Sequence, residues 1–81
     1  MSNDEIRKLI LAELHRIAPE VELGQIDPAS ELREQVDLDS MDVLNWMIAL
    51  HKKTGIEIPE ADYKRMATID ECVAYLAERM K

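Results

Sequence analysis

Ser40 has the setting that most favours chemistry in this chain, because it lies in an acidic and apolar frame, Val36-Asp37-Leu38-Asp39-Ser40-Met41-Asp42-Val43-Leu44. A catalytic serine needs a base that takes its proton and donors that stabilise an oxyanion. No base is visible near Ser40, and the Gly-x-Ser-x-Gly pattern of serine hydrolases is absent. We therefore predict that another protein modifies the Ser40 hydroxyl. The alternative is that Ser40 is a plain N-cap residue of a helix.

The other side chains that could serve catalysis or metal binding are His15, His51 and Cys72. Each histidine falls on a polar or boundary position of a predicted helix, which is typical of surface residues. Cys72 stands alone on an apolar stripe, and neither histidine has a ligand partner at helical spacing. The two glycines are too few for a glycine-rich phosphate loop. We predict no catalytic residue, no metal site and no enzyme activity.

The composition restricts the class of protein. A chain of 81 residues without a long linker is expected to form one domain, residues 1–81. The formal charge of −7 repels phosphate backbones and anionic membranes, so we expect no nucleic-acid or membrane binding. One cysteine, no signal peptide and no apolar run long enough to span a bilayer indicate a cytoplasmic protein. We expect a monomer whose acidity either steers it toward basic patches on its partners or serves only its solubility.

Helical periodicity dominates the sequence and predicts three main helices. Two of them begin with a hydroxyl residue and a glutamate three positions later, which is the spacing of a capping box. A glycine follows the middle helix and is typical of helix ends. The first helix is expected at about residues 3–18, with the capping box Ser2 and Glu5 before it and Pro19 after it. The middle helix is expected at about residues 40–54 and ends at Gly55. The last helix begins at the capping box Thr68 and Glu71. The charged face of the first helix is expected to be solvated and carries Glu5, Arg7, Lys8, Glu13 and Arg16.

The connection of residues 19–39 is long for so small a domain, and such loops are often functional. We expect it to be pinned to the core by apolar residues spaced through it, namely Val21, Leu23, Ile26, Leu32 and Val36. A helical turn is expected within residues 27–32, an extended segment at 56–59, and a short helix or turn from Pro59 to Tyr63. The predicted fold is all-α, a small four-helix bundle of three main helices and one short helix with a long first loop.

The predicted helix 40–54 has two apolar stripes, because successive residues of a helix are rotated by about 100°. The stripe expected in the core consists of Val43, Trp46, Met47 and Leu50. The second stripe lies on nearly the opposite side and consists of Met41, Leu44 and Ile48. A small bundle seldom covers both, so we predict that the second stripe is partly exposed and docks a partner. Asp39 and Asp42 would offer negative charge to that partner. The alternative is a central helix buried on all sides.

The segment Asp39-Ser40-Met41-Asp42, followed by an apolar helix and then by Thr54-Gly55-Ile56-Glu57-Ile58-Pro59, resembles the acyl carrier protein family. Members typically have Asp-Ser-Leu or Asp-Ser-Met at the start of the second helix and a Gly-Ile-Glu-Ile-Pro-like segment after it. The segment Thr68-Ile69-Asp70-Glu71-Cys72-Val73 resembles the start of the family's last helix. The resemblance extends over the whole chain in length and helix order, and it implies a four-helix bundle of the acyl-carrier type.

The resemblance implies that Ser40 receives a 4′-phosphopantetheine group from coenzyme A through a phosphopantetheinyl transferase. The thiol of this arm would hold an acyl or aminoacyl group as a thioester, so the protein would need no catalytic residue of its own. By the same resemblance, Asp39 contributes to transferase recognition, and partner enzymes dock at Met41, Asp42, Leu44 and Ile48. The implied partners are the transferase, an acyl- or aminoacyl-loading ligase, and downstream acyl-transfer enzymes.

Several residues depart from the carriers of fatty-acid synthesis. Asp37 stands where a glycine is common, and Thr54 stands where an aromatic residue is usual. The glutamates usual on the second helix are replaced by Asn45, His51, Lys52 and Lys53, so we expect a different set of partners. Residues 42–51 also resemble small carriers served by ligases related to aminoacyl-tRNA synthetases, and D-alanyl carriers share Asp-Ser-Met. The alternatives are therefore an aminoacyl carrier and a helical interaction module in which Ser40 is an N-cap.

Overall fold

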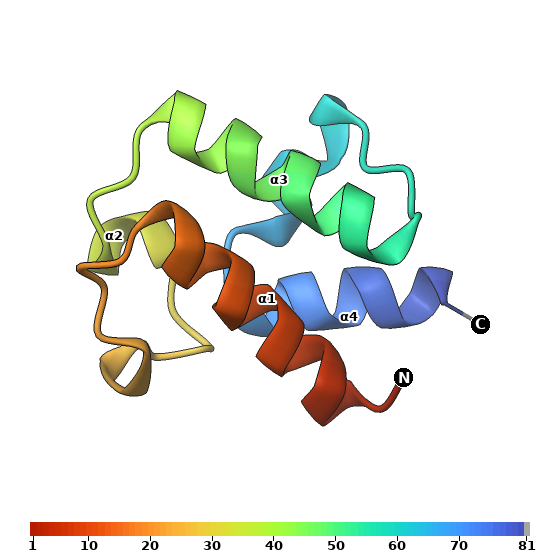
Figure 1. The fold of residues 1–81 in the computed structure, drawn as a ribbon, viewed down its shortest axis with the longest axis horizontal. Helices are drawn as coiled ribbons and strands as arrows, with labels where there is room; N and C mark the ends of the chain where they lie inside the picture. Colours follow the sequence, from red (N-terminus) through yellow and green to blue (C-terminus); the bar gives the residue numbers. More distant parts are fainter. Residues whose placement is uncertain (81) are drawn as a thin grey trace.

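Three helices make up most of the fold in the computed structural model, which describes residues 1–80. They are α1 (Asn3–Ile17), α3 (Ser40–Thr54) and α4 (Ile69–Arg79), and they are joined by η1 (Leu23–Gln25), α2 (Leu32–Gln35) and η2 (Glu60–Met66) (Figure 1). Residues 1–80 contain no strand, so the prediction of a small all-α bundle with three main helices is confirmed. None of the helices in these residues has the length and apolar character needed to cross a membrane.

The ends of the main helices agree with the local signals in the sequence. The Ser2 hydroxyl accepts a hydrogen bond from the Glu5 backbone N–H at 3.2 Å, and the Thr68 hydroxyl accepts one from Glu71 at 3.0 Å. In each case the glutamate carboxylate accepts from the backbone N–H of the cap residue, which completes the capping box. Gly55 ends α3 with a φ of 73°, a left-handed conformation that favours glycine. Both predicted capping boxes and the glycine stop are therefore confirmed.

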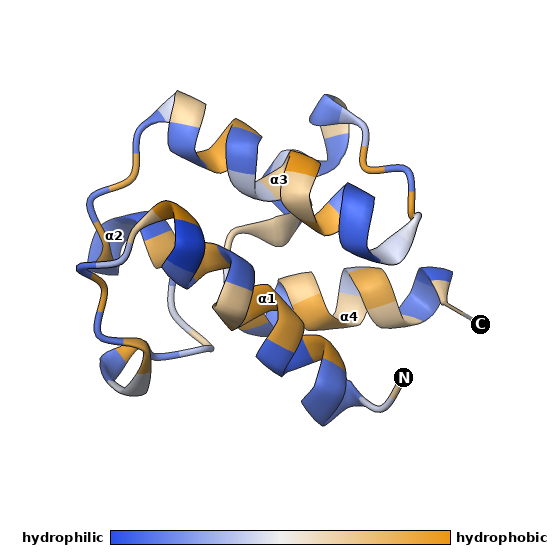
Figure 2. Ribbon diagram, in the orientation of Figure 1, coloured by the Kyte–Doolittle hydropathy of each residue, from blue (hydrophilic) through white to orange (hydrophobic). Residues whose placement is uncertain are grey.

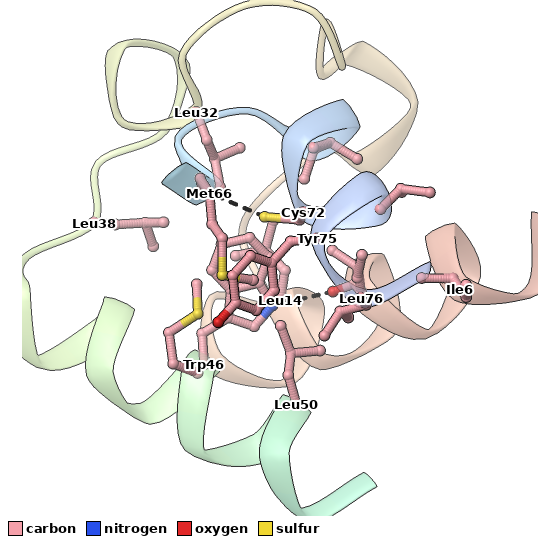
Figure 3. Close-up of a cluster of buried hydrophobic side chains, with 14 of the residues drawn as sticks. Ile6, Leu14, Leu32, Leu38, Trp46, Leu50, Met66, Cys72, Tyr75 and Leu76 are labelled. Atoms are coloured by element: carbon pink, nitrogen blue, oxygen red, sulfur yellow. Dashed lines mark hydrogen bonds between the residues drawn. The ribbon is translucent and has the colours of Figure 1, made fainter. Parts of the chain in front are cut away.

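The core lies where α1 packs against both α3 and α4, and the apolar faces of the three helices are turned toward one another (Figures 1 and 2). The stripe of α3 predicted for the core is confirmed, since Trp46, Met47 and Leu50 are buried and Val43 is partly buried against them. The Trp46 indole N–H also donates to the backbone carbonyl oxygen of Ile10 at 3.1 Å (Figure 3). This hydrogen bond, which the sequence did not indicate, satisfies the one polar atom of a buried side chain.

Glu13 is an exception to the solvated face predicted for the first helix. Only 5% of its surface is exposed, because α1 has α3 on one side and α4 on another. Arg16 donates a hydrogen bond from Nη1 to Glu13 Oε1 at 3.4 Å, so the carboxylate is paired where it is buried. The prediction for Glu13 was wrong because the periodicity of one helix does not reveal how many neighbours that helix has.

The long connection between α1 and α3 is pinned to the core, as predicted. Leu32 is buried, and the partly buried side chains packed against the core are Val21, Leu23, Ile26 and Val36. The turn predicted within residues 27–32 is present, since the Ser30 N–H donates to the Asp27 carbonyl oxygen at 3.2 Å, and the regular helix α2 begins only at Leu32. The Asp27 carboxylate accepts from the Ala29 N–H at 3.0 Å and from the Ser30 hydroxyl at 2.8 Å. These bonds hold residues 27–30 in a turn that competes with helix formation.

The segment η2 begins where predicted, after Pro59, but it continues to Met66 instead of ending at Tyr63. Met66 is buried in the core. The Tyr75 hydroxyl of α4 donates to Asp62 Oδ2 at 2.6 Å, and η2 packs against α4. Tertiary contacts with α4 therefore hold a longer helical segment than its local sequence indicates.

Replacing Trp46 with alanine should lower the free energy of unfolding by about 3–5 kcal/mol, because it leaves a cavity in the core and removes the hydrogen bond to the Ile10 carbonyl oxygen. The measurement is chemical denaturation followed by circular dichroism. The control is Ile48→Ala on the exposed side of the same helix, which should change the stability by about 0.5 kcal/mol or less. Equal losses in the two variants would show that Trp46 does not anchor α3.

Candidate functional site

Ser40 is the first residue of α3, and its side chain is exposed at the junction between loop and helix. The residue that caps the helix is Asp39, whose Oδ1 accepts from the Asp42 backbone N–H at 2.8 Å. Asp42 Oδ2 accepts in return from the Asp39 backbone N–H at 3.3 Å, which forms a third capping box. The alternative in which Ser40 is the N-cap is therefore wrong. The sequence spacing of Asp39 and Asp42 could have revealed this box, because a carboxylate can replace the hydroxyl of a capping residue.

The hydroxyl of Ser40 is left available by this arrangement. The side-chain hydrogen bonds at the junction involve Asp39 and Asp42, and none in the described part of the chain uses the Ser40 oxygen. The carboxylates also lie at the positive end of the helix dipole, where negative charge is favourable. An exposed hydroxyl on a rigid helix start can enter the active site of a second protein. The junction therefore fits the covalent attachment of a group to Ser40.

The other predicted candidates for chemistry form no hydrogen bond with Ser40 within residues 1–80. His15 and His51 are exposed, and the Nδ1 atom of His51 lies 2.7 Å from the Ile56 carbonyl oxygen beyond the C-terminal end of α3. Cys72 is fully buried, and burial raises the pKa of its thiol to about 12. Residues 1–80 contain no group of three or more histidine, cysteine or acidic side chains arranged to hold a metal ion. The Ser40 hydroxyl is thus exposed, and no hydrogen bond within residues 1–80 joins it to a histidine, a cysteine or a carboxylate side chain.

An apolar pocket of about 470 Å³ opens beside Ser40 and Met41. It lies between α3, α2 and η2, and its apolar lining includes Leu32, Leu38, Val43, Leu44, Trp46, Met47, Tyr63 and Met66. Its size falls within the range of pockets that bind small molecules. Exposed charged side chains also line it, namely Glu31, Arg33, Glu60 and Lys64. The sequence did not indicate the pocket, because segments far apart along the chain form its walls.

The second stripe of α3 is partly exposed, as predicted. Met41 is 61% exposed, Ile48 is 42% exposed, and Leu44 is partly buried at the edge of the pocket. The alternative of a helix buried on all sides is therefore wrong. The stripe extends along α3 from the position next to Ser40, so a protein that reaches Ser40 would meet these side chains first.

Comparison with known proteins identifies the family. The family described as "Phosphopantetheine attachment site" matches residues 4–76. The acyl carrier protein of Campylobacter hominis is 33% identical over 73 residues, which cover 90% of this chain and 86% of that protein. The acyl carrier protein of Rubrobacter xylanophilus is 28% identical over 75 residues, which cover 89% of this chain and 93% of that protein. The acyl carrier protein of Helicobacter hepaticus is 34% identical over 56 residues, 69% of this chain and 74% of that protein.

These matches extend over nearly the whole bundle and agree with the presentation of a hydroxyl at the start of α3. Members of this family carry a phosphopantetheine group and interact with acyl-transfer enzymes. They are carriers and not enzymes. The chain belongs to the acyl carrier protein family and is a phosphopantetheine-bearing carrier.

Proposed function

We propose that Ser40 is the residue that bears 4′-phosphopantetheine and that the cargo is an acyl group with an apolar chain. The observation that supports the attachment site is the exposed, unbonded hydroxyl of Ser40 directly after the Asp39 cap. In the transfer, the Ser40 oxygen forms a bond to the phosphorus of the phosphopantetheine part of coenzyme A. The bond from that phosphorus to the nucleotide breaks, 3′,5′-ADP leaves, and the serine proton passes to a base of the transferase. When attached, the arm supplies a thiol that holds the cargo as a thioester.

Asp39 and Asp42 have two roles in this proposal. Their reciprocal hydrogen bonds fix the backbone on both sides of Ser40, so the hydroxyl is presented in one geometry. Their carboxylates also place negative charge beside the site, and Asp39 offers this charge to basic residues of the transferase. Each carboxylate uses one oxygen in the cap, and within residues 1–80 neither accepts a hydrogen bond from the Ser40 hydroxyl. This supports modification by another protein over self-catalysed chemistry.

The pocket beside Ser40 supports an apolar cargo. Its walls come mostly from aliphatic, methionine and aromatic side chains, and it opens next to the attachment residue. An alkyl chain that enters the pocket is removed from water, which stabilises the bound chain by about 25 cal/mol per Å² of apolar surface buried. The lining carboxylates, Glu31 and Glu60, are exposed, so an ammonium group that enters the apolar part of the pocket would lose its hydration there, which is costly. An aminoacyl cargo loaded by a synthetase-like ligase is thus less well supported than an acyl cargo.

The exposed stripe of α3 supports the docking of partner enzymes next to Ser40. Met41 and Ile48 are large apolar side chains that the bundle leaves exposed, and Leu44 lies between them. A partner that covers this stripe removes apolar surface from water and at the same time places its active site near the arm. Asp42 adds a charged contact at the N-terminal end of the stripe. We assign Met41, Asp42, Leu44 and Ile48 to the docking surface for the transferase, the loading enzyme and the acyl-transfer enzymes.

Incubation with coenzyme A and a promiscuous phosphopantetheinyl transferase should add the mass of one phosphopantetheine group to the wild-type chain. Ser40→Ala should gain no mass, because the accepting oxygen is gone, whereas Ser30→Ala should be modified like the wild type. Intact-mass spectrometry measures the product. Addition to Ser40→Ala, or no addition to a folded wild-type chain, would refute the proposed attachment site.

Replacing Ile48 with glutamate should lower kcat/KM of the transferase reaction by about tenfold, because the docking surface loses an apolar contact. The melting temperature should stay close to that of the wild type, since the side chain is exposed. The rate of 3′,5′-ADP release measures the reaction, and Ala74→Glu on the exposed side of α4 is the matched control. A large loss of stability in Ile48→Glu with an unchanged rate would place Ile48 in the core and would contradict the docking role.

An octanoyl group on the Ser40 arm should shift the NMR signals of the Met47 and Met66 methyl groups and raise the melting temperature. Both effects follow from an alkyl chain that occupies the pocket of the folded protein only. An alanyl group on the same arm is the comparison and should leave the two methyl signals unchanged. Equal shifts with both cargoes, or none with octanoyl, would contradict an apolar cargo in this pocket.

A further inference from the structure

The α3 surface carries opposite charges at its two ends. Asp37, Asp39 and Asp42 lie at the end next to Ser40, while Lys52 and Lys53 lie in the last turn. Asp39 and Lys52 are thirteen positions apart, which corresponds to about 20 Å along the helix axis. The exposed side chain of Ile48 lies between the two ends. Two adjacent exposed lysines are a notable local charge in a chain whose formal net charge is −7.

An open groove of about 500 Å³ lies beside the two lysines, between α1 and α3. α1 contributes Glu13 and Arg16 to it, and α3 contributes Ile48, Ala49 and Lys52 together with Asn45 and Lys53. Figure 1 shows α1 and α3 next to one another, and Figure 2 shows the last turn of α3 as a hydrophilic segment. The groove thus combines one exposed apolar side chain with charged side chains from two helices.

The net charge of the groove is positive. The buried carboxylate of Glu13 pairs with Arg16 at 3.4 Å and balances its charge. Within residues 1–80, neither Lys52 nor Lys53 forms an ion pair, so the two ammonium groups set the charge of the groove. Like charges across an interface are strongly unfavourable, and opposite charges fix the orientation of a partner. A partner surface that covers this groove must therefore present carboxylates to Lys52 and Lys53.

We propose that this groove docks a partner protein whose surface has an apolar side chain for Ile48 and carboxylates for Lys52 and Lys53. The inference rests on the proposed function, in which the partner also reaches Ser40. Basic residues of that partner face Asp39 and Asp42 near its active-site entrance, and its acidic residues face the far end of α3. The opposite charges at the two ends of α3 allow one orientation of the partner and disfavour the reversed one. This orientation aligns the active-site entrance with the arm on Ser40.

Lysines in the last turn of a helix also interact favourably with its dipole, which would be a purely structural role. The two roles differ in what they predict. A structural role affects only the stability of the bundle, whereas a docking role affects binding of an acidic partner at unchanged stability. The test therefore uses a binding readout together with the melting temperature.

The probe is a synthetic amphipathic peptide of about four helical turns, with leucines on one face and glutamates beside them. A second peptide has lysine in place of each glutamate. The expected result in an NMR titration of the full chain is that the acidic peptide shifts the amide signals of Asn45, Ile48, Lys52 and Lys53. The basic peptide should instead shift signals near Asp39 and Asp42. Added salt should weaken the binding of both peptides.

Lys52→Glu and Lys53→Glu should each weaken binding of the acidic peptide by about tenfold, because attraction is replaced by repulsion. Lys8→Glu on another face of α1 changes the net charge equally and should alter the affinity by about twofold or less. If either reversal fails to fold, Lys52→Gln and Lys53→Gln should still weaken binding relative to Lys8→Gln. Absence of acidic-peptide binding, binding away from the groove, or equal affinity in the lysine variants would overturn the proposal.

Self-association is a further outcome that sedimentation analysis of the same samples resolves. A wild-type dimer that dissociates in Lys52→Glu would identify a second copy of this chain as the occupant and would overturn the proposal. Phosphopantetheine transfer to the wild-type chain separates the groove proposal from the proposed function. Modification of Ser40 without groove-dependent peptide binding refutes only the groove, whereas a folded chain that is never modified refutes the proposed function.

Discussion

The contact of Trp46 with α1 determines the rotation of α3 about its own axis. The indole is 2% exposed, and its N–H is bound to the Ile10 carbonyl oxygen, so this side of α3 must face the core. Met41, Leu44 and Ile48 are rotated by roughly 140–160° from Trp46, as helix geometry requires. They therefore face outward. One buried side chain thus decides both which residues of α3 pack in the core and which residues are turned away from it.

The division of roles at the start of α3 follows from the cap. Asp39 satisfies the backbone N–H of Asp42, and Asp42 returns a hydrogen bond to Asp39. Ser40, which directly follows Asp39, forms no capping hydrogen bond, although serine is a common capping residue. The cap stabilises the helix start through carboxylates and leaves the exposed Ser40 hydroxyl without a hydrogen-bonding role in it. This arrangement suits a carrier, because the reactive thiol of such a protein comes from an attached group.

The charge of the molecule is organised around the same helix. Its acidic end surrounds Ser40, and its basic end borders the groove shared with α1. Burial of Glu13 matters here because its carboxylate balances Arg16 and leaves Lys52 and Lys53 to set the sign of the groove. A net charge of −7 describes the whole chain but not the surface that a partner meets along α3. Local charge, more than the total, decides partner orientation.

The sequence by itself determined the three main helices, their caps at Ser2 and Thr68, the stop at Gly55 and the two stripes of α3, since all depend on contacts within a few residues. It also predicted the acyl carrier protein family, which the comparisons confirmed, whereas Ser40 as the attachment residue stays a prediction. Only the tertiary structure decided that Glu13 is buried, that η2 continues to Met66, and that a pocket opens beside Ser40. These features depend on which helices meet, and residues distant in the chain create them. The periodicity of a single helix does not predict such long-range contacts.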